Sequence, residues 1–283
     1  MGLLLMRWLA RWPLRRVHAV GAALGWLSWA ASTSYRRRMA DHARLAAVAP
    51  AQRRAAVAQA GRLLAETPWL WQRPPGQWHG AQVDWTGIAH VEAALAAGRG
   101  IVFLTPHMGS FEVTAQAFAE RFAPVPITVL FRPARKAWLR DWVAQSRQRP
   151  GLVAVPTTLA GVRQMLRALK RGEAVGLLPD QVPPDGMGVW APFFGRPAYT
   201  MTLAARLVRQ SGAACLLAWG ERLPGGRGYT VHLQPGPDLT AAPDVDAATA
   251  LVNTAMEGLI RTAPAQYLWG YNRYKGPRGE AQP

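Results

Sequence analysis

The chain has 283 residues, of which 50% are apolar and 17% are charged. This composition excludes a disordered chain and suffices for one large domain or two small ones. A mean hydropathy of −0.03 argues against many membrane spans. The single cysteine excludes a disulfide framework or a zinc cluster of several thiolates, and the six histidines form no HExxH motif.

The charge is strongly positive. Thirty-three basic residues face sixteen acidic ones, which gives a net charge of +17, and only three of the basic residues are lysine. Arginine binds phosphate and carboxylate through its planar fork. The surplus therefore indicates an anionic partner, which can be a membrane face, a phosphorylated substrate, an acidic protein or nucleic acid.

Residues 1–40 are predicted to anchor the chain to a membrane. They contain seven arginines and no acid, and the nineteen residues between Arg16 and Arg36 carry no formal charge. That length lies at the lower edge of what crosses a bilayer, and arginines brace both ends of the stretch. The segment can span the membrane or lie in its interface. A buried N-terminal helix of a soluble fold is the alternative.

Residues 41–82 are predicted to be a helical segment packed on the domain that follows, with Pro50 separating two helices and Pro68 ending the second. From Val83 onward, short apolar runs alternate with amphipathic segments. The predicted strands are 83–88, 100–105, 125–131, 152–156, 174–179, 213–219 and 229–235. The predicted helices are 90–98, 110–122, 134–147, 158–172, 199–212 and 246–264. We expect residues 83–283 to form an α/β domain with a mixed, mostly parallel central sheet flanked by helices.

The sharpest candidate for chemistry is the stretch from His107 to Glu112, which directly follows an apolar strand. Ligands of open α/β sheets collect beyond the carboxyl ends of the strands. If His107 lies in the turn and Glu112 in the first turn of the next helix, the carboxylate can orient the imidazole and raise its basicity. A loop histidine bonded to the backbone and a surface glutamate are an equally weighted alternative.

Three further features accompany this pair. Asp180 follows another apolar strand, where it can hold an arginine or orient substrate, or simply form an Asx turn. The loop 191–200 carries Phe193, Phe194 and Arg196, which offer apolar surface beside a cation unless the rings pack in the core. The clustered cations suit a phosphate-bearing ligand, although each alone is usually a solvated surface charge. These are Arg132, Arg147, Arg149, Arg273 and Lys275.

These residues resemble the lysophospholipid acyltransferase superfamily, and in particular its lipid A late (lauroyl or myristoyl) acyltransferases. The family's histidine, four residues and acid match His107 to Glu112. Its later arginine matches Arg147, and its Pro-Asp-Gln element matches residues 179–181. The stretches 192–200, 203–213 and 264–269 match further family motifs. After Trp269 the family's ending is only partly kept, by Arg273 and Lys275.

The resemblance implies transfer of a fatty acyl chain from an acyl thioester to a hydroxyl of a lipid A precursor. The donor is acyl-acyl carrier protein or acyl-coenzyme A, and the acceptor is a phosphorylated glycolipid. His107 is then the general base, Glu112 orients it, Arg147 stabilises the oxyanion, and Asp180 positions that arginine or the acceptor.

The resemblance assigns acceptor binding to basic residues, with Arg132, Arg149, Arg196, Arg273 and Lys275 as candidates, and an acyl groove to Phe193 and Phe194. It implies no metal or cofactor, and it places the enzyme on the cytoplasmic face of a bacterial inner membrane.

Other functions stay open at this point. A glycerophospholipid or another glycolipid can be the acceptor instead of lipid A. A hydrolase of thioesters or esters is less favoured, because the sequence has no G-x-S-x-G motif. A basic nucleic-acid-binding protein is a rival from another class, but the densest basic region flanks an apolar segment, which fits a membrane better.

Overall fold

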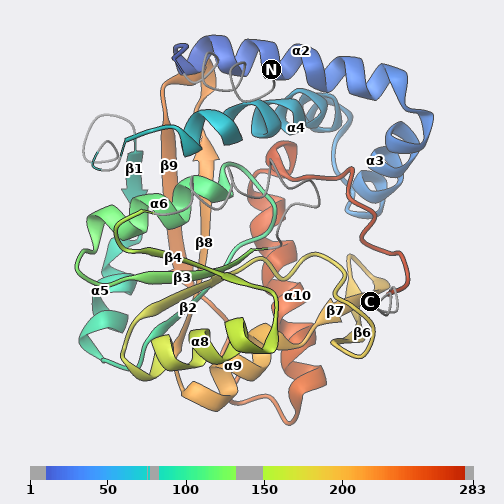
Figure 1. Ribbon diagram of the computed structural model, residues 1–283. Coiled ribbons are helices and arrows are strands. Elements are labelled where there is room, and N and C mark those ends of the chain that lie inside the picture. The colour runs from blue at the N-terminus through green and yellow to red at the C-terminus, as the bar shows by residue number, and fades with distance from the viewer. Residues whose placement is uncertain (1–10, 75, 77–82, 132–148, 278–283) are drawn as a thin grey trace.

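The computed structural model describes residues 11–74, 76, 83–131 and 149–277 (Figure 1). Its centre is a seven-stranded sheet in the order β1-β9-β8-β2-β5-β3-β4. The strands are β1 (Val83–Thr86), β2 (Ile101–Leu104), β3 (Ile127–Phe131), β4 (Leu152–Pro156), β5 (Ala174–Leu177), β8 (Ala214–Arg222) and β9 (Tyr229–Pro235). All seven lie where the alternation of apolar runs predicts them.

The sheet is mostly parallel, as predicted. Strands β8, β2, β5, β3 and β4 run in one direction. Strand β9 pairs antiparallel with β8, and β1 runs parallel to β9. The central strand β2 is buried at all four positions, because helices cover both faces of the sheet. This explains why its sequence is continuously apolar instead of alternating.

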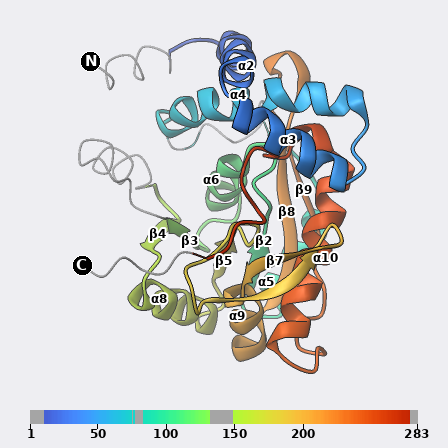
Figure 2. The same cartoon turned by 90° about the vertical axis from the view of Figure 1, so that its right-hand side faces the viewer.

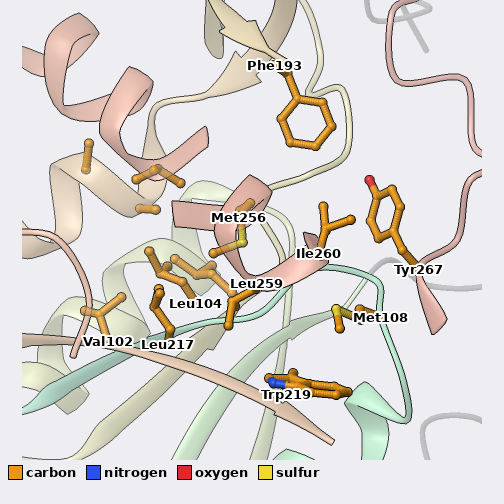
Figure 3. Close-up of a cluster of buried hydrophobic side chains, with 14 of the residues drawn as sticks. Val102, Leu104, Met108, Phe193, Leu217, Trp219, Met256, Leu259, Ile260 and Tyr267 are labelled. Atoms are coloured by element: carbon orange, nitrogen blue, oxygen red, sulfur yellow. The ribbon is translucent and has the colours of Figure 1, made fainter. Parts of the chain in front are cut away.

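Two layers of helices enclose the sheet (Figure 2). One face packs against α5 (Ile88–Ala96) and α6 (Phe111–Arg121). The other face packs against α8 (Leu159–Lys170), α9 (Leu203–Ser211) and α10 (Val245–Thr262). Figure 3 shows the second core, in which Met256 and Leu259 of α10 lie over Leu104 of β2 and Leu217 of β8.

Three N-terminal helices gather at the end of the sheet where the parallel strands finish (Figure 1). They are α2 (Leu14–Ala31), α3 (Thr33–Leu45) and α4 (Pro50–Trp71). Helices α2 and α4 touch backbone to backbone through glycines, since a Cβ on Gly61 would lie 2.0 Å from the carbonyl oxygen of Gly21. This close approach fixes how the N-terminal helices sit against each other.

The predicted end of α4 at Pro68 is wrong, because the helix continues to Trp71 with Pro68 inside it. The side chains of Trp69 and Leu70 are fully buried, and the Trp69 indole donates to the carbonyl of Trp12 at 2.8 Å. This tertiary packing outweighs the backbone hydrogen bond that proline removes.

No helix among the described residues is long and apolar enough to cross a bilayer. The membrane anchor expected within residues 1–40 therefore stays a prediction, and residues 1–10 lie outside the described part of the chain.

The stretch 188–201 also differs from expectation. In place of a loop over 191–200 and a helix from 199, it forms an antiparallel hairpin of β6 (Gly188–Phe193) and β7 (Arg196–Met201). The β-branched and aromatic residues in Tyr199–Thr200 favour a strand once β6 is available as a partner. The helix predicted over 134–147 lies outside the described residues.

Candidate active site

Strand register brings His107 and Asp180 together. Strands β2 and β5 are parallel neighbours, with Leu104 opposite Leu177. His107 and Asp180 each lie three residues beyond these paired leucines, so the two chains leave the sheet side by side. The carboxyl edge of a parallel sheet is where ligands of such folds bind.

One carboxylate holds both the ring and the backbone of His107. Oδ1 of Asp180 lies 2.6 Å from Nδ1 of His107, and Oδ2 accepts from the His107 backbone N–H at 2.9 Å. Because a carboxylate only accepts, Nδ1 carries the proton, and Nε2 of the neutral ring is the acceptor. This arrangement orients the imidazole as a general base.

The Asp180 carboxylate is almost wholly buried, with 2% of its surface exposed, yet it stays ionised. Burial by itself raises the pKa of Asp180, but the positive charge of His107 when its ring is protonated, and the hydrogen bonds from its ring and backbone, lower the pKa below the ordinary value. The His107 side chain is 18% exposed, which gives its outer nitrogen access to a ligand.

The outer nitrogen faces a glutamine. The side-chain nitrogen of Gln181 lies 3.0 Å from Nε2 of His107. Sequence reasoning places Gln181 in a family motif but misses this contact. A substrate hydroxyl can displace the Gln181 amide and form a hydrogen bond to Nε2 in its place.

The C-terminal segment 264–269 packs against the loop that carries His107. Leu268 donates its backbone N–H to the His107 carbonyl at 3.1 Å, and Gly109 donates to Gln266 at 2.9 Å. The hydroxyl of buried Tyr267 lies beside Asp180; burial and then the Asp180 charge raise the pKa of Tyr267 well above its ordinary value. The 264–269 motif therefore fixes the loop that carries His107.

The carboxylate at Nδ1 is that of Asp180, whereas the sequence favoured Glu112 as the acid that orients the imidazole. Glu112 lies in the first turn of α6, is partly exposed, and is one of the two acids whose charge acts on Arg149. The neighbouring Phe111 packs edge-on against the imidazole at 5.2 Å between ring centroids. A pairing of His107 with Glu112 is not shown, and the role of Glu112 stays a prediction.

Two of the basic residues expected to bind substrate make interior contacts. Arg273 is 2% exposed, and its guanidinium donates to the carbonyl of Tyr199 and the hydroxyl of Thr200. Burial lowers the pKa of Arg273, and the charges of Tyr267 and then Asp180 raise it. Arg149 donates from Nη2 to the carbonyls of Leu70 and Trp71, where it caps the carboxyl end of α4. These contacts brace the fold, but Nε of both arginines and Nη1 of Arg149 have no hydrogen-bond partner among the described residues, so their roles in substrate binding stay predictions.

The remaining candidates divide between core and surface. Phe193 and Phe194 are buried in the core, at 2% and 6% exposed, so the structure shows the packing alternative and not an open groove. Arg196 is exposed, with its guanidinium carbon 4.8 Å from the centroid of the Tyr274 ring, and Lys275 lies similarly over a neighbouring tyrosine. Arg132 and Arg147 lie outside the described residues.

An apolar cavity of about 50 Å³ lies beside the site, between α6 and the sheet. Its walls include Phe111 and Phe118 of α6, Phe103 of β2 and Thr105, which follows β2. The volume is that of about two water molecules in the liquid. It can take only a short part of an alkyl chain unless the lining side chains move.

Among the described residues, no group of three or more histidine, cysteine, aspartate or glutamate side chains is placed to hold a metal ion. The site itself offers an oriented imidazole with an ionised carboxylate behind it.

Residues 1–276 match the model of the bacterial lipid A biosynthesis acyltransferase family. The chain is 27% identical over 73% of its length to a lipid A biosynthesis lauroyltransferase of Escherichia coli, and the match spans 65% of that relative. It is 30% identical over 78% of its length to a lipid A biosynthesis palmitoleoyltransferase of Escherichia coli, spanning 71% of that protein.

A phosphatidylinositol mannoside acyltransferase of Mycobacterium tuberculosis is 28% identical over 64% of the chain and is matched over 56% of its own length. These relatives share acyl transfer to glycolipids, and the match of the family model across nearly the whole chain favours that chemistry over the nucleic-acid-binding alternative. The chain belongs to the bacterial lipid A biosynthesis acyltransferase family.

Proposed function

We propose that this protein transfers a fatty acyl chain from an acyl thioester, such as acyl-acyl carrier protein, to a hydroxyl of a lipid A precursor. The observation that carries the proposal is the His107–Asp180 pair at the carboxyl edge of the sheet in a chain of this family.

The proposed reaction follows from which atoms of the site hold a proton and which can accept one. Nε2 of His107 takes the proton of the acceptor hydroxyl as its oxygen forms a bond to the thioester carbonyl carbon. Asp180, which holds the proton on Nδ1, stabilises the imidazolium that results. When the tetrahedral intermediate collapses, the carbon–sulfur bond breaks and His107 returns the proton to the leaving thiolate. The products are an ester and a free thiol.

The oxyanion of the intermediate needs hydrogen-bond donors. Arg147 remains our first candidate because the family's corresponding arginine matches it in sequence. Glu112 is proposed to act next to the acceptor or to hold a cation, since Asp180 already orients His107. Exposed Arg196, together with Arg132 and Lys275, is proposed to meet the phosphates of the acceptor.

The apolar cavity next to Phe111 is proposed to receive part of the acyl chain. It begins at residues adjoining His107, so a chain entering it would present its thioester carbonyl near the imidazole. Widening requires the side chains of α6 to move away from the sheet.

Helix α2 is proposed to hold the enzyme at the cytoplasmic face of the inner membrane. Three of its apolar side chains, Val20, Leu24 and Leu27, are exposed at 37%, 51% and 64%. Exposed Arg15 and Arg16 lie in its first turn, where they can meet anionic headgroups.

Another glycolipid is the second candidate acceptor, favoured by the similarity to the phosphatidylinositol mannoside acyltransferase. Mass spectrometry of lipid A from cells with and without the protein separates the two. We expect lipid A to differ by the mass of one acyl chain. Unchanged lipid A together with one acyl chain on a different glycolipid would favour the second acceptor, and no acylated difference in either lipid would contradict acyl transfer.

A further inference from the structure

Another cavity, polar and of about 360 Å³, lies between the N-terminal helices and the turn after β8. Arg15 and His18 of α2 line one side, Gln59 and Arg62 of α4 line another, and Arg222 with the turn 223–226 closes it. None of these residues belongs to the proposed catalytic pair, and the inference below does not depend on acyl transfer.

The charge of Arg222 is already balanced. Its Nε and Nη2 donate to the two carboxylate oxygens of Glu66, each at 2.8 Å, and both side chains are buried. The buried ring of His18 lies 2.8 Å from the same carboxylate. Burial on its own raises the pKa of Glu66, but the charge of Arg222 and hydrogen bonds from His18 and Arg222 lower it to about 2. Glu66 is therefore ionised and satisfied from within.

The charge of Arg62 has no such partner among the described residues. Its Nε is buried without a hydrogen bond, and no ion pair there involves its guanidinium. Burial, then the nearby charge of Arg222, lowers the pKa of Arg62, while Glu66 raises it. The buried Nε of Arg62 thus lacks a hydrogen-bond acceptor among the described residues, and an anion in the cavity can supply one.

Other donors point to the same kind of ligand. Arg15 is exposed at the rim, next to the turn that carries Gly226. The side-chain oxygen of Gln59 accepts from Nη1 of Arg222 at 2.7 Å, which leaves its NH2 group as a donor. Among the described residues that line the cavity, Glu221 is the one acid, and its carboxylate also contacts the ring of His232 at 2.9 Å. Positive charge and donors thus exceed acceptors in this cavity.

We propose that the cavity between α2, α4 and the β8–β9 turn binds a phosphate group through Arg62 and Arg15. Arginine recognises phosphate bidentately, and two guanidiniums match its charge. An anionic phospholipid carries such a phosphate on its headgroup together with acyl chains. A free phosphate offers the same group without the chains.

The cavity also adjoins the catalytic loop. Nη2 of Arg222 donates to the carbonyl of Gly109 at 2.8 Å, two residues after His107. The Arg222 side chain therefore links the proposed phosphate site directly to the loop that carries the imidazole.

Isothermal titration of the full-length chain in a nonionic detergent tests the proposal. The probes are dihexanoyl phosphatidylglycerol, dihexanoyl phosphatidylcholine and inorganic phosphate. Arg62→Gln removes the charge with little change of shape, and Arg54→Gln, at an exposed position of the same helix, is the matched control. We expect Arg62→Gln to weaken phosphatidylglycerol binding about tenfold, Arg62→Gln with Arg15→Gln about a hundredfold, and Arg54→Gln to leave it unchanged.

The probes distinguish the source of the phosphate. Phosphatidylglycerol binding that exceeds that of the other two probes assigns a lipid headgroup, and equal binding of inorganic phosphate that is lost in Arg62→Gln assigns a free anion. Binding that Arg62→Gln and Arg54→Gln change equally, or no binding of any probe, overturns the proposal. Acyl transfer is not measured, so this result is independent of the proposed enzyme activity.

Discussion

Replacing Asp180 with asparagine alters one atom of the proposed catalytic pair and turns one of its two acceptor oxygens into a donor. The backbone N–H of His107 can only donate, so the single amide oxygen must take the place of Oδ2, 2.9 Å from that nitrogen. The amide NH2 group then faces Nδ1 at the position of Oδ1. Nδ1 becomes an acceptor, the proton moves to Nε2, and the base is lost.

The cost follows from this change of tautomer. General-base catalysis is worth about 10²- to 10⁴-fold, and loss of the carboxylate also destabilises the imidazolium. We expect kcat of Asp180→Asn to fall about 10³- to 10⁴-fold, which is about 4–5.5 kcal/mol of transition-state stabilisation. The assay measures acyl transfer from a labelled acyl thioester to a lipid A precursor, with circular dichroism to confirm folding.

Asp185→Asn is the matched control, because Asp185 is an exposed aspartate in the same loop. It should keep kcat within about twofold, as surface substitutions away from a site usually do. Transfer by folded Asp180→Asn at more than a tenth of the unaltered rate would refute the assignment of Asp180 as the residue that orients His107.

Three further changes have defined outcomes. Glu66→Gln leaves a buried arginine unpaired and should lower the free energy of urea unfolding by about 3–5 kcal/mol at pH 7. Because the folded-state pKa of Glu66 is lowered to about 2, that difference should be full above about pH 4.5 and shrink as pH falls toward 2; a difference independent of pH would contradict it. Gly61→Ala forces a methyl group to 2.0 Å from the Gly21 carbonyl oxygen, so the free energy of thermal unfolding should fall by about 1–3 kcal/mol. Gly258→Ala, in open helical surroundings, should not lower it. Gln181→Glu puts a carboxylate next to Nε2 of His107, which favours the protonated ring. Activity should therefore fall about tenfold or more at pH 7 and recover at higher pH. Gln181→Ala should not show this dependence on pH.

Much of the fold could be predicted from the pattern of apolar runs. The strands are short, apolar and separated by segments with helical periodicity, and each apolar run predicted as a strand is a strand of the central sheet. What failed was local: Pro68 does not end α4, since the burial of Trp69 and Leu70 is a tertiary effect that no propensity contains. The β6–β7 hairpin was missed because a strand pair depends on a partner that the reading of one segment does not supply.

His107 and Asp180 lie just beyond the carboxyl ends of their strands, as predicted, but the contact between them could not be predicted. The sequence shows that His107 and Asp180 each follow an apolar strand by the same interval; it does not show that β2 and β5 are neighbours. Chain proximity therefore favoured Glu112. Similarly, Arg273 looks like a surface cation in sequence, and only the fold reveals that Tyr199 and Thr200 hold it in the interior.

The most direct test of the account is acyl transfer by His107→Ala. The purified variant is incubated with an acyl-acyl carrier protein and a lipid A precursor, and the product is followed by mass spectrometry beside the unaltered protein. If His107 takes the proton of the acceptor hydroxyl, the unaltered protein adds one acyl chain and the variant does so about 10³-fold more slowly or not at all. Transfer by the variant within tenfold of the unaltered rate would show that another group activates the hydroxyl.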